Sequence, residues 1–236
     1  MISKNDKEKA ETYLKEQGVI DILFSGDESE LPPNTFMLAL LHRLIRKRRP
    51  RRIIEFGVGF STLVIAHALY QNLQDENWGA EGVDPAFYGK LWSVETNPFW
   101  IENLEQKIPE YLSYFIDIRQ TTTEAEIIEG ELCHLSRDLP NITPDFVYID
   151  GPHVHDVSSM INGLGFIQED GRLRSQITAD ILLYESTLKE GFYMLLAGQT
   201  NNMHFLCRHL KRKYRVIWNK SKNYSTFELL ERTEDF

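Results

Sequence analysis

The segment from Arg51 to Thr62, RRIIEFGVGFST, constrains the fold of this chain more than any other part of the sequence. An apolar run ends in the acidic residue Glu55, and the glycines Gly57 and Gly59 follow before a Ser-Thr pair opens an amphipathic segment. This pattern predicts a strand, a tight turn and a helix N-terminus, which together form the local geometry of a nucleotide-type site. The two glycines would allow the backbone to approach a bound ligand closely.

The same segment indicates the character of the ligand. The third glycine of the dinucleotide-binding fingerprint is absent, and Thr62 stands in its place. A glycine is expected at that point when a pyrophosphate lies on the helix N-terminus. Because this glycine is missing and Glu55 precedes the loop, the segment favours a cationic or zwitterionic ligand. Ser61 or Thr62 is expected to cap the helix.

The composition narrows the class of protein. With 236 residues and a hydrophobic content of 42%, a single α/β domain with decorations is expected. A formal net charge of −9 argues against general nucleic-acid binding. The two cysteines, Cys133 and Cys207, provide neither a disulfide framework nor a zinc knuckle. Residues 1–9 are polar and no stretch approaches the length of a membrane span, so we expect a cytoplasmic protein that does not enter a membrane.

Apolar periodicity predicts alternating helices and strands. The predicted helices cover residues 6–17, 35–48, 61–73, 98–108, 179–188 and 202–213. The predicted strands cover residues 52–56, 91–95, 114–121, 146–149 and 192–196, and an alternating pair at 215–219 and 225–230 closes the chain. This order predicts a mostly parallel sheet, to which the closing pair adds an antiparallel strand at one edge. We expect residues 1–50 to form an N-terminal helical cap and residues 51–236 to form the body of one domain.

Ligands of such sheets bind outside the carboxyl ends of the strands. This rule brings together three segments, at residues 57–62, 95–97 and 150–153. Glu95 ends the second strand, where a carboxylate can accept hydrogen bonds from both ribose hydroxyls, as an acidic residue does in dinucleotide-binding folds. The alternative is a solvated glutamate that caps the next helix.

Three motifs at these strand ends resemble those of class I S-adenosylmethionine-dependent methyltransferases. They are ExGxGxST at residues 55–62, VExNPxW at residues 94–100 and DFVYIDGPH at residues 145–153. The resemblance implies a Rossmann-like α/β fold, in which a seven-stranded sheet is the middle of a three-layer sandwich, and S-adenosylmethionine as the cofactor. It also implies that the glycine loop lies under the methionine part of the cofactor and that Glu95 binds the ribose.

The resemblance further implies that the residues after the third strand flank the adenine. The family often has an acidic residue before a small one there, whereas this chain reads TTTEA at residues 121–125. Thr123 is the candidate contact in this stretch. The full set of expected cofactor-binding residues is Glu55, Gly57, Gly59, Ser61, Thr62, Glu95, Thr123 and Asp150.

The sequence DGPH at residues 150–153 is the expected reaction corner. Four groups here could serve as a base, a substrate anchor or a metal ligand, namely Asp150, His153, His155 and Asp156. Asp150 and His153 are the candidate catalytic residues, and His153 suits a general base because its unperturbed pKa lies near neutrality. Alternatively, Asp150 caps the turn and both histidines are surface residues. The fifth strand ends in LAGQ, without the acid that some metal-dependent O-methyltransferases use there, so no metal ligand is assigned.

The predicted function is methyl transfer from S-adenosylmethionine to a small-molecule acceptor, at oxygen. Two alternatives stay open. One is an NAD-type Rossmann oxidoreductase, which Thr62 and Glu55 disfavour. The other is a methyltransferase-like protein that binds a partner without catalysis.

Two charged or polar segments lie outside these motifs. The basic run at residues 46–52 precedes the first strand, at the end of the sheet opposite the cofactor. It is therefore interpreted as a complement to helix C-termini rather than as a nucleic-acid surface. Residues 156–177 follow the fourth strand and are expected to form a lid or an acceptor wall, whereas residues 74–90 should emerge at the amino ends of the strands.

Overall fold

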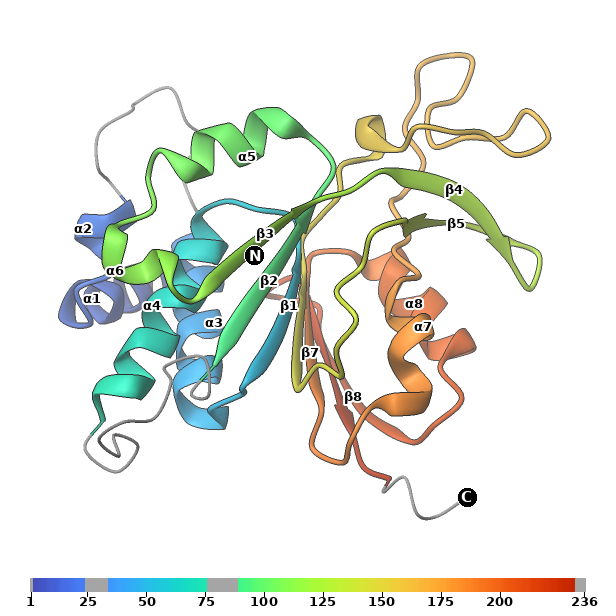
Figure 1. Ribbon diagram of the computed structural model, residues 1–236. Coiled ribbons are helices and arrows are strands. Elements are labelled where there is room, and N and C mark those ends of the chain that lie inside the picture. Colours follow the sequence, from blue (N-terminus) through green and yellow to red (C-terminus); the bar gives the residue numbers. More distant parts are fainter. Residues whose placement is uncertain (1, 24–33, 76–88, 232–236) are drawn as a thin grey trace.

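The computed structural model describes residues 2–23, 34–75 and 89–231, and its centre is a seven-stranded sheet (Figure 1). The strands are β1 (Arg52–Phe56), β2 (Lys90–Glu95), β3 (Ile116–Gln120), β6 (Phe146–Ile149), β7 (Tyr193–Ala197), β8 (Tyr214–Asn219) and β9 (Tyr224–Leu229). Their order is β3-β2-β1-β6-β7-β9-β8, and β9 alone pairs antiparallel with both of its neighbours in this sheet. The predicted seven-stranded, mostly parallel sheet is confirmed, and its antiparallel strand lies one position inside the edge strand β8.

Helices cover both faces of the sheet and complete the three layers (Figure 1). They are α1 (Lys4–Glu16), α2 (Ile20–Leu23), α3 (Thr35–Arg48), α4 (Phe60–Gln74), α5 (Pro98–Glu105), α6 (Glu110–Ser113), α7 (Ile181–Tyr184) and α8 (Thr200–His209). Successive strand residues point to opposite faces, so Ile53 of β1 joins a buried cluster with Ile45 of α3 and Leu69 of α4. Its neighbour Ile54 joins a second cluster with Leu206 of α8. None of the helices in the described ranges is long and apolar enough to cross a membrane.

Residues 123–136 form a hairpin that the sequence analysis did not predict. Strands β4 (Thr123–Ile128) and β5 (Glu131–Ser136) pair antiparallel in a sheet of their own, which extends away from the main sheet (Figure 1). The turn residues Glu129 and Gly130 both have positive φ, 48° and 84°. This is the two-residue turn geometry that matches the twist of a hairpin. An ion pair between Arg208 and Glu131 ties the hairpin to α8.

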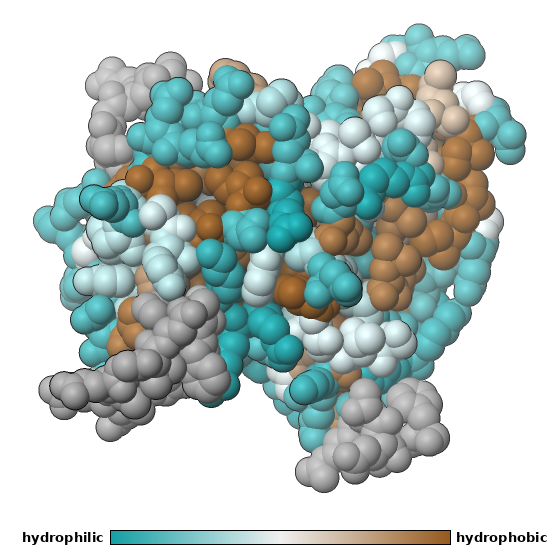
Figure 2. All heavy atoms as spheres, in the orientation of Figure 1, coloured by the Kyte–Doolittle hydropathy of each residue, from teal (hydrophilic) through white to brown (hydrophobic). Residues whose placement is uncertain are grey.

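The segment between β6 and α7 contains little regular structure, apart from the short 3-10 helix η2 (Val154–Asp156). It begins at the carboxyl end of β6, as expected, and projects beside the hairpin (Figure 1). Apolar side chains lie exposed over this projecting part of the surface (Figure 2), namely Ile127, Met160, Leu164, Ile167 and Leu173. The expected lid role stays a prediction. The predicted placement of residues 74–90 falls mostly outside the described residues.

The basic run at residues 46–52 is engaged by carboxylates from three other parts of the chain. The ion pairs are Arg46–Asp75, Arg49–Asp75, Arg48–Glu228 and Arg52–Asp145. Asp75 follows the end of α4, where cations also complement the helix dipole. The pairing supports the interpretation of this run as a structural feature of the amino end of the sheet.

The N-terminal helices enclose a chain of three polar rings. The Tyr13 hydroxyl lies 2.8 Å from His42 Nδ1, and His42 Nε2 lies 3.2 Å from His67 Nδ1. Burial lowers the pKa of His42 to about 3 and that of His67 to about 4, and the charge of Arg46 acts in the same direction. Both imidazoles are therefore neutral in the folded protein at neutral pH.

These two histidines are expected to make the fold acid-sensitive. Their pKa values are lower in the folded state than in an unfolded chain, where histidine titrates near about 6.5, so stability falls as the pH drops below that value. We expect these two histidines to lower the free energy of unfolding by about 2–4 kcal/mol when the pH falls from 7 to 5. Urea unfolding at both pH values, for the wild type and for His42→Gln/His67→Gln, measures this difference. The exposed His155→Gln is the control, and equal acid sensitivity in all three proteins would contradict the expectation.

Candidate functional site

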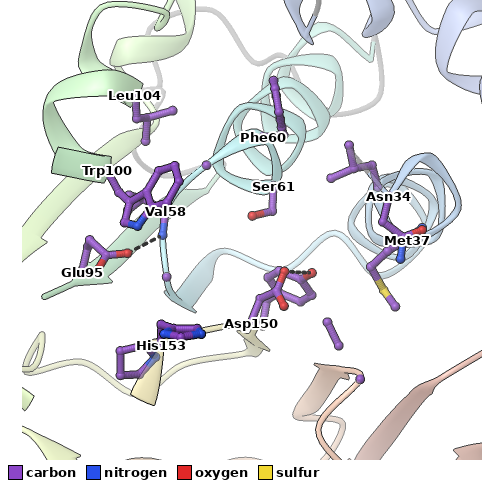
Figure 3. A pocket seen from close by; sticks show the side chains of 18 of the residues that line it. Asn34, Met37, Val58, Phe60, Ser61, Glu95, Trp100, Leu104, Asp150 and His153 are labelled. Carbon is purple, nitrogen blue, oxygen red and sulfur yellow. Dashed lines mark hydrogen bonds between the residues drawn. The ribbon is translucent and has the colours of Figure 1, made fainter. Parts of the chain in front are cut away.

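A cavity of about 960 Å³ lies at the carboxyl ends of the parallel strands (Figure 3). The loop after β1, the end of β2 and the residues after β6 line it, together with α5. The remaining wall comes from the start of α3, the residues after β7 and the β8–β9 turn. The residues predicted for the site that line this cavity are Gly57, Gly59, Ser61, Glu95, Asp150 and His153.

Glu95 holds the glycine loop in place from the end of β2. Its Oε2 accepts a hydrogen bond from the amide of Val58 at 3.1 Å (Figure 3), and its Oε1 accepts bonds from the amides of Thr96 and Asn97 at 2.7 and 2.8 Å. Burial raises the pKa of this carboxyl, and the three backbone donors counteract the shift. A carboxylate offers about four acceptor positions, so one remains on Oε2 for a hydroxyl of a ligand in the cavity.

Glu55 and Thr62 lie beneath the loop and do not line the cavity. Both are fully buried, and Glu55 Oε2 accepts hydrogen bonds from Thr62 Oγ1 at 2.7 Å and from Ser93 Oγ at 2.8 Å. Burial raises the pKa of Glu55 to about 7. The sequence motif predicts that both residues contact the ligand, whereas in the structure they lie under the loop and support it.

Three consecutive amides of the loop point inward. Gly57 donates to the carbonyl of Val94 at 2.9 Å, Val58 donates to Glu95, and Gly59 donates to Thr62 Oγ1 at 3.1 Å. A site for pyrophosphate needs such amides directed at the ligand. Because these donors are used within the protein, the loop suits a ligand without phosphates at this point.

Gly57 and Gly151 pack backbone against backbone. A Cβ atom added to Gly151 would lie 2.9 Å from Gly57 Cα, and one added to Gly57 would lie 3.2 Å from the nitrogen of Gly151. Gly57 also has a φ of 96°, which favours glycine. This close approach places the first turn of the loop directly beside Asp150.

Asp150 and His153 both follow the end of β6 and line the cavity (Figure 3). Asp150 Oδ2 accepts a hydrogen bond from the hydroxyl of the buried Tyr148 at 3.1 Å. The carboxyl faces the cavity but is desolvated by the protein around it, which raises its pKa to about 6. His153 is exposed, and its ring stacks on that of His155 with the centroids 4.9 Å apart.

Asp156, a candidate of the reaction corner, and Thr123, the expected adenine contact, lie in different positions relative to the cavity. Asp156 lines the cavity and accepts a hydrogen bond from Asn97 Nδ2 at 3.1 Å. Thr123, the expected adenine contact, is fully buried at the start of β4, and its hydroxyl lies 2.7 Å from that of Thr96 rather than on the cavity surface. Within the described ranges, no three histidine, cysteine or acidic side chains gather as a metal site.

Two walls of the cavity were not predicted. On α5, Phe99 and Trp100 line the cavity with exposed fractions of 60% and 44%, and Trp100 lies next to Glu95 (Figure 3). The Pro98-x-Trp100 pattern after Glu95 was the available signal for this wall.

The second unpredicted wall joins the two ends of the chain. Lys222, in the β8–β9 turn, forms an ion pair with Asp6 of α1 at 2.8 Å and lies over the ring of Phe36. Asn34 and Met37 line the cavity from the same side. The N-terminal helices thus form part of the site, and no local motif marks this contact.

Comparisons with solved structures show which fold this is. The O-methyltransferase TomG from Streptomyces achromogenes, solved with S-adenosylmethionine, is 14% identical, with 97% of this chain and 91% of that chain covered and a TM-score of 0.50. A Staphylococcus aureus protein provisionally named a caffeoyl-CoA O-methyltransferase is 11% identical, with coverages of 97% and 100% and a TM-score of 0.53. The methyltransferase PaMTH1 from Podospora anserina, solved with SAH, is 10% identical, with 98% of each chain covered and a TM-score of 0.50. The chain has a methyltransferase fold. No protein-family model and no curated protein matches its sequence.

The cavity of this methyltransferase fold has acceptors and an apolar face that fit S-adenosylmethionine. A Cβ atom on Gly59 would meet no protein atom within 4 Å, so the loop backbone faces open space. Glu95 presents an acceptor for a hydroxyl, and Trp100 presents a flat apolar face beside it. The carboxyl of Asp150 offers negative charge to a cationic ligand, which agrees with the zwitterionic ligand that the sequence favours.

Proposed function

We propose that this protein is an S-adenosylmethionine-dependent methyltransferase that modifies an oxygen atom of a small-molecule acceptor. The inward orientation of the loop amides carries the proposal. In a cavity with the acidic residue Glu95 at the second strand, these amides favour S-adenosylmethionine over a dinucleotide, because the three loop amides are not available to a pyrophosphate. The NAD-type oxidoreductase is disfavoured on the same ground.

The residues around the cavity have separate tasks in this proposal. S-adenosylmethionine, when bound, supplies an already activated methyl group, so the protein has to align the acceptor and receive its proton. Asp150 is placed to accept that proton, because its raised pKa of about 6 still leaves it mostly ionised at neutral pH. The exposed ring of His153 lines the same cavity and is the alternative base.

The cavity walls favour a small acceptor. The N-terminal helices and the β8–β9 turn narrow the cavity, and the pair of Asp6 and Lys222 joins them. The proposal includes a cytoplasmic location. Cys133 and Cys207 are both free, and free thiols are typical of proteins in a reducing compartment.

Glu95→Ala is expected to weaken S-adenosylmethionine binding by about 1–3 kcal/mol, or roughly 5- to 150-fold. The variant loses the acceptor for the ribose and also the anchor of the Val58 amide. Isothermal titration calorimetry on the folded variant measures the effect, and Glu102→Ala, an exposed glutamate of α5 that does not line the cavity, is the matched control.

The same titrations test the function itself. We expect S-adenosylmethionine to bind the wild type and NAD not to bind. Binding of NAD alone would replace the proposal with the oxidoreductase alternative. Unchanged affinity in Glu95→Ala would remove the ribose role from this residue. Binding of S-adenosylmethionine without transfer to any member of a broad metabolite panel would favour the non-catalytic alternative.

A further inference from the structure

A second cavity of about 490 Å³ adjoins the first. The two cavities share Asp150, His153, Ala197 and Gly198, so a molecule in the second can reach the reaction corner. The rest of its lining comes from Val154, from residues 173–176 near the end of the segment after β6, and from residues 199–201 at the start of α8. Nothing in the proposed function so far uses this space.

Arg174 gives the second cavity a positive charge. Its Nε donates to the carbonyl of Gly165 at 3.0 Å, which fixes the side chain and leaves the terminal nitrogens as donors. Among the described residues, no carboxylate lies within 4.0 Å of this guanidinium. Arg172, two positions earlier, differs from Arg174 in two ways. It forms an ion pair with Asp170 at 2.6 Å, and it does not line the cavity.

The start of α8 adds donors to the same cavity. The helix has ten residues and begins at Thr200, and the side chain of Gln199 does not cap it. The first amides of a helix have no partner within the helix, and the dipole makes this end positive. Gln199 Oε1 accepts a hydrogen bond from Asn202 Nδ2 at 2.9 Å, while the buried Nε2 of Gln199 has no partner in the described part of the chain.

The second cavity is lined by one basic side chain, Arg174, and by the shared carboxylate of Asp150. The first cavity contains both signs of charge, because Glu95, Asp150 and Asp156 line it together with Lys107, Lys220 and Lys222. A molecule in the second cavity with a hydroxyl at one end and an anionic group at the other would be oriented by Asp150 and Arg174. Its anionic end would be repelled from Asp150 and attracted to Arg174.

We propose that the acceptor is a hydroxylated carboxylic acid, with its carboxylate on Arg174 and the α8 N-terminus and its hydroxyl at Asp150 and His153. This inference rests on the proposed function and adds the substrate class to it. A carboxylate fits better than a phosphate, because the carboxylate of Asp150 in the same cavity repels a dianion more strongly than a monoanion.

Matched acceptor pairs test the substrate class. Each pair contains a hydroxylated carboxylic acid, such as a hydroxybenzoate or a hydroxycinnamate, and its primary amide, which has the same shape without the charge. Transfer of labelled methyl from S-adenosylmethionine is measured for the wild type, Arg174→Gln and the control Arg172→Gln. We expect the acids to be methylated in preference to the amides. In Arg174→Gln, KM for an acid should rise about tenfold or more with a much smaller change in kcat.

The readouts separate this inference from the proposed function. Unchanged S-adenosylmethionine affinity in Arg174→Gln, together with a lost preference for acids, supports the inference. Equal or better use of the amides, equal behaviour of the two arginine variants, or no methylation of any acid by a protein that binds S-adenosylmethionine would overturn it. Failure to bind S-adenosylmethionine at all would instead defeat the proposed function, and calorimetry with the acids alone would still report on Arg174.

Discussion

Asp150→Asn is expected to lower turnover by about a hundredfold or more, the usual range for loss of a positioned base. Asparagine has nearly the same size and still accepts the hydrogen bond from the Tyr148 hydroxyl, so the β6 end keeps its shape. It cannot take up a proton from the acceptor, and it removes the negative charge that faces the cofactor loop. Steady-state kinetics on the folded variant, with an acceptor identified from the panel, measure the loss.

The pH dependence assigns the proton more directly. The pKa of Asp150 is raised to about 6, so the active carboxylate is lost as the pH falls through that value, and the rate should drop on the acid side. This decrease in rate at acid pH should persist in His153→Ala and disappear in Asp150→Asn. The control is Asp156→Asn, which removes one charge from the same cavity. Equal losses in both aspartate variants would indicate a general charge effect, and an acid limb that disappears in His153→Ala would make His153 the base.

The parts of the fold that could be predicted are those with strong local signals. Residues 35–48 carry an apolar stripe and follow Asn34, which caps the helix, and α3 has those bounds. The apolar runs that form β1 and β6 likewise end where the loop glycines and Asp150 begin. The β4–β5 hairpin was missed because its strands mix glutamates with apolar residues, although the Glu-Gly turn was a usable signal.

The supporting role of Glu55 follows from strand periodicity. Side chains alternate along a strand, so Glu55 lies on the same face as Ile53, which packs towards α3 and α4. Its carboxylate therefore reaches Thr62 at the start of α4 rather than the cavity. The position of Glu55 before the loop does not by itself show this orientation.

Other parts of the site depend on contacts between distant segments. Lys222 lines the cavity and is held by Asp6, which lies 216 positions away in the sequence. The second cavity likewise needs the segment after β6 to fold back to the start of α8. The rule that ligands bind at the carboxyl ends of the strands identifies the residues at those ends. It does not identify the segments from elsewhere in the chain that complete the cavity.

Gly151→Ala is expected to disrupt the cofactor loop although it adds a single methyl group. The new Cβ would lie 2.9 Å from Gly57 Cα, 3.2 Å from Gly57 nitrogen and 3.4 Å from the carbonyl oxygen of Phe56. All three are backbone atoms, and hydrogen bonds fix them, since Gly57 donates to Val94 and Gly151 donates to Phe56. The loop must shift to relieve the clash, at a cost of about 1–3 kcal/mol in stability.

A shifted glycine loop should also lower S-adenosylmethionine affinity by about tenfold or more, because ligand contacts tolerate little misplacement. The matched control is Gly165→Ala, where the added Cβ would lie 2.8 Å from Met160 Cγ, an atom of a flexible side chain that can rotate away. Thermal unfolding and calorimetry on both variants measure the two effects. Wild-type affinity in Gly151→Ala would show that the loop moves freely away from β6, and the close contact of the two glycines would then have no part in cofactor binding.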